Sequence, residues 1–150
     1  MKIGNFLRTA AVVLGTILSL SPPSNSQQRA PRTFFCGSYN GQPATMINNP
    51  SRGNAAFIVW GSDNFSSSGL TPQKRCREVS QRFQRYQEQG LLNYIIPETI
   101  NGYPVLCASR SANGSCDGVL FVLRPGDDPQ AVVEHIVNIN LRITAAPIHE

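Results

Sequence analysis

Short apolar runs separated by turn-forming residues predict six strands in the ordered part of this chain. Three runs precede the first helical pattern and three follow it; they lie at 33–36, 44–47, 56–60, 94–96, 103–106 and 119–123. Asn-Gly pairs at 40–41 and 101–102 predict turns, because both residue types tolerate the positive φ angles of tight hairpins. The run at 119–123 is apolar throughout, which is typical of a strand in the middle of a sheet.

A hairpin around Asn101-Gly102 has a defined register. If these two residues form the turn, Ile100 lies opposite Tyr103 and Ile96 lies opposite Cys107. Two prolines in the flanking runs lack backbone donors, so part of this hairpin is expected at a sheet edge or at a bulge.

Two segments show the spacing of amphipathic helices. The first begins with Thr71 as N-cap and Pro72 in the first turn, and ends near Gln89, before Gly90. Its apolar residues follow at spacings of three, four and three, which places them on one face: Cys76, Val79, Phe83 and Tyr86. The second helix begins at Pro129 and buries Val132, Val133, Ile136 and Ile139. The order β-β-β-α-β-β-β-α predicts an α+β domain with both helices on one face of a largely antiparallel sheet.

The N-terminus has the three parts of an export signal. Lys2 and Arg8 precede an apolar stretch at 10–18, and small residues follow up to Ser26. We therefore expect a signal peptide at 1–26, a flexible lead-in at 27–33 and a single domain at 34–150. An uncleaved membrane anchor is the alternative, although the apolar stretch is shorter than the ~20 residues of a bilayer span. The signal by itself predicts a location outside the cytosol.

Four cysteines follow this signal, which predicts two disulfides in an oxidising compartment. Three pairings are formally possible. Cys107 and Cys116 end one predicted strand and begin the next, so a bridge between them is the geometrically favoured choice. Cys36 would then pair with Cys76 and tie the first strand to the buried face of the first helix.

Composition excludes several classes of function. Without Lys2 and Arg8 the formal charge falls from +4 to +2, which does not indicate a nucleic-acid-binding protein. The cysteines form no Cys-x-x-Cys pair and the two histidines are far apart, so neither a metal site nor a dithiol redox site is expected. No cofactor is expected.

The loop before the first helix is the best candidate for a binding site. It combines aromatic, acidic, amide and hydroxyl side chains with the start of a basic helix; the candidate residues are Trp60, Asp63, Asn64, Phe65, Ser66 and Arg75. These residues have an alternative role in packing the loop and capping the helix. The basic residues of that helix predict either a solvated outer face or weak contact with an anionic membrane or an acidic protein; they are Lys74, Arg75, Arg77, Arg82 and Arg85.

A small hydrolase or ligand-binding enzyme that uses the Asp63–Ser68 loop is the enzymatic alternative. Three consecutive serines lie at 66–68, and His135 is a possible base. However, the sequence has no Gly-x-Ser-x-Gly elbow, and His135 falls on the outward side of the second helix. We therefore expect no catalytic residue.

Several segments in order resemble a known family. They include Phe35-Cys36, Trp60-Gly61-Ser62, Leu92-Asn93-Tyr94, Val105-Leu106-Cys107 and Gly118-Val119-Leu120-Phe121, and the joined stretch Phe-Ser-Ser-Ser-Gly-x-Thr-Pro-x-x-Arg-Cys at 65–76 is the most specific. The chain resembles the circadian oscillating protein (COP) family of cyanobacteria over nearly all of its mature length. The resemblance implies an exported protein of the periplasm, the thylakoid lumen or the extracellular space that attaches loosely to a membrane, and it supplies no reaction, cofactor or catalytic residue. We therefore expect a non-enzymatic domain that binds a protein partner or a membrane surface, with its activity and oligomeric state left open.

Overall fold

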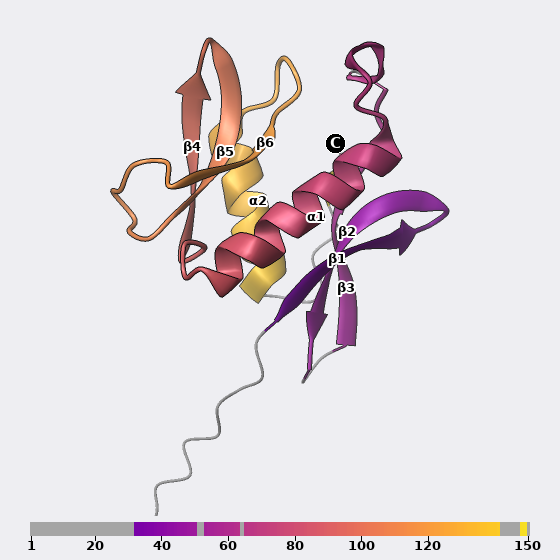
Figure 1. The fold of residues 1–150 in the computed structure, drawn as a ribbon, viewed down its shortest axis with the longest axis horizontal. Coiled ribbons are helices and arrows are strands. Elements are labelled where there is room, and N and C mark those ends of the chain that lie inside the picture. The colour runs from indigo at the N-terminus through magenta and orange to yellow at the C-terminus, as the bar shows by residue number, and fades with distance from the viewer. Residues whose placement is uncertain (1–31, 51–52, 64, 142–147, 150) are drawn as a thin grey trace, which may run out of the picture.

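The computed structural model describes residues 32–50, 53–63, 65–141 and 148–149, with side chains up to residue 136 (Figure 1). The expected signal peptide and Asn64 lie outside the described residues. The elements, in chain order, are β1 (Thr33–Tyr39), β2 (Gln42–Asn49), β3 (Gly53–Val59), a short 3-10 helix (Ser66–Ser68), α1 (Pro72–Glu88), β4 (Tyr94–Ile100), β5 (Tyr103–Ser109), β6 (Gly118–Val122), α2 (Pro129–Leu141) and β7 (Ile148–His149).

The strands form two sheets, whereas the sequence analysis expected one. One sheet has the order β1-β2-β3-β7 and the other β4-β5-β6. The loop and α1 separate β3 from β4, and β4 pairs with β5 instead of with β3. The short strand β7 was not expected, and it pairs in parallel with β3 through Ile58 and Val59. The α+β class and the β-β-β-α-β-β-β-α order are confirmed, and both sheets are antiparallel apart from the β3–β7 pair.

Both Asn-Gly pairs form the hairpin turns that the sequence predicts. Asn40 and Asn101 have φ angles of 49° and 52°, and the glycine after each is also at positive φ. The β4–β5 register is the expected one, since Ile100 lies opposite Tyr103 and Ile96 opposite Cys107. Pro97 is on the edge strand β4, where a missing N–H costs little.

Helix α1 runs between the two sheets and contacts both (Figure 1). Its start is capped by Thr71, whose hydroxyl oxygen accepts from the Lys74 N–H, and Gly90 follows its end at a φ of 69°. Arg82 donates to the carbonyl of Leu120 on the outer edge of β6. β6 lies at the edge of its sheet, which corrects the expectation of a central strand, and its apolar side chains Leu120 and Phe121 are nevertheless buried.

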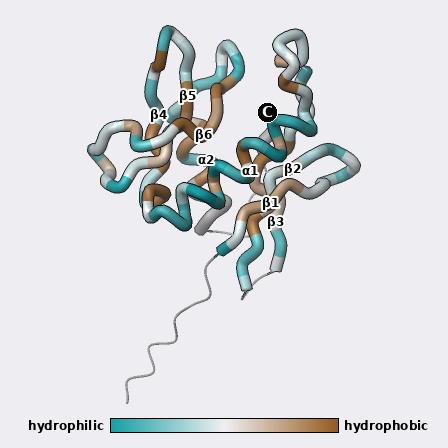
Figure 2. Tube along the Cα trace, in the orientation of Figure 1, coloured by the Kyte–Doolittle hydropathy of each residue, from teal (hydrophilic) through white to brown (hydrophobic). Residues whose placement is uncertain are grey.

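One hydrophobic core joins both sheets. In Figure 2 hydrophobic residues gather on the strands and alternate with hydrophilic ones along α1. Phe34, Phe57 and Phe83 form a cluster with ring centroids 5.1–5.7 Å apart. Trp60, which directly follows β3 of the first sheet, meets Phe121 of the second edge-to-face, with ring centroids 5.5 Å apart. The sheets are therefore packed through shared aromatic contacts rather than through backbone pairing.

Both expected disulfides are present. Cys36 pairs with Cys76, and Cys107 with Cys116, with Cα atoms 5.4 and 5.3 Å apart. Cys76 and Cys107 are fully buried. Each bridge therefore fastens a surface segment to the core, one joining β1 to α1 and the other closing the β5–β6 loop.

Candidate binding pocket beside helix α1

The loop before α1 is a compact turn organised around the backbone carbonyl of Phe65. This oxygen accepts from the backbone N–H groups of Ser68 and Leu70, both at 3.2 Å, and from the Ser68 hydroxyl at 2.7 Å. The Ser66 hydroxyl donates to the Asp63 carboxylate at 3.2 Å. These bonds close the loop on itself and hold the Phe65 and Leu70 side chains in place.

Arg75 is buried beneath this loop, so the solvated outer face, one of the alternatives for the basic residues of α1, does not apply to it. Arg75 is only 6% exposed, and its guanidinium carbon lies 4.7 Å from the ring centroids of both Trp60 and Phe65. One guanidinium nitrogen also donates to the Ser62 carbonyl and hydroxyl oxygens, at 3.4 and 3.3 Å. The cation is therefore held between two aromatic faces and connects the end of β3 to the loop.

Trp60 supports the site from the core and is not a surface residue. Its side chain is fully buried, and its indole N–H donates to the Thr45 hydroxyl oxygen at 2.9 Å. The same oxygen accepts from the Ser80 hydroxyl at 2.9 Å. This small buried network fixes the ring on which Arg75 rests, since each donor has a partner.

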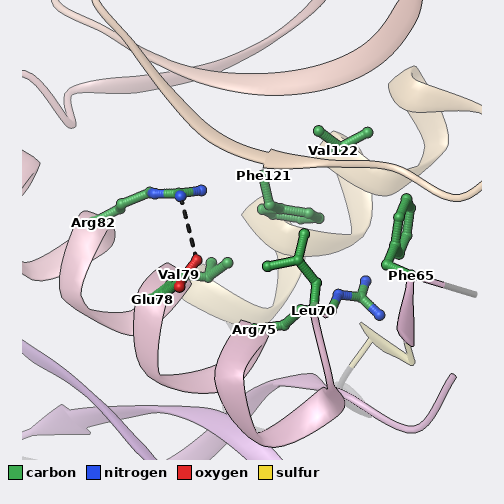
Figure 3. A pocket seen from close by; sticks show the side chains of 8 residues that line it. All are labelled: Phe65, Leu70, Arg75, Glu78, Val79, Arg82, Phe121 and Val122. Atoms are coloured by element: carbon green, nitrogen blue, oxygen red, sulfur yellow. Dashed lines mark ion pairs between the residues drawn. The ribbon is translucent and has the colours of Figure 1, made fainter. Parts of the chain in front are cut away.

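A pocket of about 100 Å³ opens between this loop, α1 and the end of β6 (Figure 3). In Figure 3 Leu70 projects toward Phe121 at its centre, Phe65 stands at one end and Arg82 at the other. Most of the surface that faces the cavity is apolar. Its lining residues are Phe65, Leu70, Arg75, Glu78, Val79, Arg82, Phe121 and Val122.

The charged rim of the pocket carries an excess of positive charge. Glu78 lies 3.7 Å from Arg82 and 4.0 Å from Lys74, all measured between charged atoms. The side chains of these three residues are 35–48% exposed. The pocket lining itself has two cations, Arg75 and Arg82, and one carboxylate, Glu78, so its net charge of +1 favours a negatively charged group.

The structure brings together only part of the candidate loop. Phe65 and Arg75 line the pocket, and Trp60 supports them from behind. Asp63 and Ser66 do not line it and bond to each other instead. Phe121 and Val122 form a wall of the pocket that the sequence did not predict, because they come from a strand far along the chain. The one weak signal for such a wall is an apolar residue at a strand end next to a turn.

A comparison with protein families gives a match over residues 33–150, to the family described as Circadian oscillating protein COP23. The chain belongs to this family. The resemblance inferred from the sequence is thereby confirmed. The comparison with curated proteins and the comparison with solved structures gave no match.

Two serines of the 66–68 cluster of this COP23-family domain form hydrogen bonds within their own loop. The hydroxyls of Ser66 and Ser68 donate to acceptors within the loop, Asp63 and Phe65. Within the described ranges, no group of three histidine, cysteine or acidic side chains is arranged to hold a metal ion. Among the helices described, none is long and apolar enough to cross a membrane.

Proposed function

We propose that this COP23-family domain is a non-enzymatic protein-binding module of an oxidising compartment outside the cytosol. Its pocket accepts one apolar side chain of a partner protein, and the basic rim pairs with a carboxylate next to that side chain. The observation that supports this proposal is the apolar pocket between Phe65 and Val122 with a positively charged edge. The two disulfides support the compartment, because such bonds persist where thiols are not kept reduced.

The size of the pocket favours an aliphatic side chain. An apolar cavity of ~150 Å³ holds benzene, so a cavity of about 100 Å³ suits a smaller, branched group. Burying four carbons stabilises a complex by ~3 kcal/mol, at ~0.8 kcal/mol for each carbon. A single anchor of this kind is typical of the few residues that dominate protein interfaces.

Arg82 on the rim of the pocket can give up its ion pair with Glu78 at a small cost in free energy. The Glu78–Arg82 pair is about one-third exposed on each side, and pairs of this kind contribute only ~0–1 kcal/mol. A carboxylate of the partner can therefore bind Arg82 without breaking a strong interaction. Because Phe65 stacks on Arg75, which in turn rests on the buried Trp60 ring, little side-chain entropy is lost when the pocket fills.

A small probe with the same chemistry tests the proposal. Titration of isotopically labelled protein with 4-methylpentanoate is expected to shift amide NMR signals of Leu70 and Val122, with a dissociation constant of the order of 1 mM. The uncharged 4-methylpentanol is expected to bind at the same place about threefold more weakly, because it lacks the carboxylate.

Three variants make the test specific. Val122→Trp fills the mouth of the pocket from a partly exposed position and is expected to abolish both sets of shifts. Arg82→Gln should remove the preference for the acid over the alcohol, whereas Arg77→Gln, outside the pocket, should leave it unchanged. If shifts are absent, or if they occur elsewhere and survive Val122→Trp, the pocket is not the binding site.

A membrane surface is the other binding target that the basic helix allows. Release of the native protein from membranes by high salt or carbonate would show peripheral attachment. Retention after both washes would instead support the uncleaved anchor. N-terminal sequencing of the native protein tests export directly, because cleavage after Ser26 leaves Gln27 as the first residue.

A further inference from the structure

One edge of the first strand of the larger sheet pairs with no strand of the described part of the chain. Within the described residues β1 pairs only with β2, and Tyr39 opposite Gln42 closes their two-residue turn. In an antiparallel pair, successive residues direct their backbone groups alternately toward and away from the partner strand. This alternation places the N–H and C=O groups of Phe34, Cys36 and Ser38 on the outer edge.

A side chain of α1 already occupies one position on this edge. The side-chain oxygen of Gln84 accepts from the Phe34 N–H at 2.8 Å. This bond confirms that the N–H points away from β2, and it shows that the edge can accept an amide carbonyl from outside the sheet. No strand of the described chain supplies such a carbonyl to Cys36 or Ser38.

A groove of about 350 Å³ runs between this edge and the outer flank of α1. Its two walls are joined by the Cys36–Cys76 disulfide, so their spacing is set before anything binds. The residues that line it are Phe34, Phe35, Cys36, Arg77, Ser80, Gln81, Gln84, Arg85 and Glu88.

The helix wall of the groove is basic. Arg77 and Arg85 are both exposed and lie eight residues apart, a separation of ~12 Å along a helix. Among the described residues neither forms an ion pair with an acidic side chain. Glu88 is the single acidic residue of the lining, and it accepts from the Gln84 amide at 2.7 Å.

We propose that this groove binds an extended acidic segment of a partner protein, which adds to β1 as a further strand. Backbone groups of the segment pair with the edge at Cys36 and Ser38. Side chains alternate along a strand, so acidic residues at every second position face Arg77 and Arg85. The intervening side chains lie on the opposite face, beside Phe35, which is 38% exposed. The partner motif is therefore an alternation of acidic and apolar residues.

A synthetic peptide of alternating glutamate and valine, about eight residues long, tests this inference. Fluorescence anisotropy of the labelled peptide with the purified protein is expected to show saturable binding. The double variant Arg77→Gln/Arg85→Gln should weaken binding at least about tenfold, because it removes both cations. Arg110→Gln, an exposed arginine outside the groove, is the matched control and should leave binding unchanged. The urea midpoint of each variant checks that the fold is retained.

A second peptide separates strand addition from simple charge attraction. N-methylation at every second residue removes the donors that would pair with β1, and it should abolish binding although the charge is unchanged. Equal binding of the methylated and unmethylated peptides would overturn the proposal. So would binding to anionic vesicles but not to the peptide, or a dimer that forms through β1 and excludes the peptide. Val122→Trp should not affect this peptide, so a failure here is distinct from a failure of the pocket proposal.

Discussion

The buried cation of Arg75 allows a quantitative test of how the candidate site is built. Arg75→Met retains most of the aliphatic stem but removes the charge from between Trp60 and Phe65. Two desolvated cation–π contacts are lost, each worth up to ~2 kcal/mol. Two long hydrogen bonds to Ser62 are also lost, each worth ~0.5 kcal/mol. We expect the free energy of unfolding to fall by ~2–4 kcal/mol.

Urea unfolding is a suitable assay because the chain has one tryptophan, and that residue is Trp60. Its fluorescence reports both unfolding and the loss of the stacked cation. With a slope of ~2 kcal/mol per M, the middle of the usual range, the midpoint should shift by about 1–2 M. Circular dichroism measured in parallel should give the same midpoint if unfolding is two-state.

Two further variants and one change of conditions identify the cause of the shift. Arg77→Met, on the exposed flank of α1, should change stability by no more than ~0.5 kcal/mol. Arg75→Lys should have an intermediate effect, because an ammonium group lacks the planar face that stacks on both rings. The Arg75→Met effect should persist in 1 M NaCl, where screening acts over ~3 Å and weakens exposed pairs far more than buried ones. If Arg75→Met and Arg77→Met shift the midpoint equally, the stacked cation does not stabilise the site and our reasoning is wrong.

Three other changes should lower the free energy of unfolding by amounts that follow from the structure. Replacing Cys36 and Cys76 together with alanine should cost ~4 kcal/mol on chain-entropy grounds, about 1 kcal/mol more than the same change at the shorter bridge; urea midpoints under oxidising conditions measure both, and the reverse ranking would contradict the loop-length argument. Thr45→Val leaves the Trp60 N–H and a serine hydroxyl without their shared acceptor and should cost ~2–4 kcal/mol, whereas Thr45→Ser should retain most of the stability in the same assay. Asn101→Val places a β-branched residue at a φ of 52° and should lower the melting temperature, with a cost of ~1–3 kcal/mol, whereas Asn101→Gly should stay within ~0.5 kcal/mol of the parent; equal values for the two variants would mean that the turn is not strained by valine.

The pocket and the groove lie on opposite flanks of α1. The pocket is formed with β6 and the groove with β1, and the two share no lining residue. The helix has a different chemistry on each flank, with the Glu78–Arg82 pair on one and the exposed Arg77 and Arg85 on the other. Combining Val122→Trp with the groove variants therefore separates two cases. If one partner spans both flanks, its binding is weakened by either change; if two partners bind separately, each change weakens the binding of one partner only.

The disulfide pairing shows how far reasoning from the sequence can go when an element is placed correctly. Placing Cys107 and Cys116 at the ends of two neighbouring predicted strands favoured one of the three possible pairings and left Cys36 to pair with Cys76. The structure confirms the favoured pairing. In contrast, the helical stripe could not show that Arg75 is buried, because a stripe drawn through apolar residues leaves every arginine on the solvated side.

The sequence by itself determined the local elements. The Asn-Gly turns, the Thr71 cap and the glycine that ends α1 act within a few residues, so the hairpins, the helix bounds and the element order follow from them. Only the tertiary structure decided that the strands divide into two sheets and that α1 lies between them. It also decided the burial of Arg75, because the two rings that enclose its charge come from the end of β3 and from a loop, and their spacing depends on how both pack on the helix. The pocket has the same origin, since Phe121 and Val122 reach it through packing between distant segments, and no pattern along the chain encodes that distance.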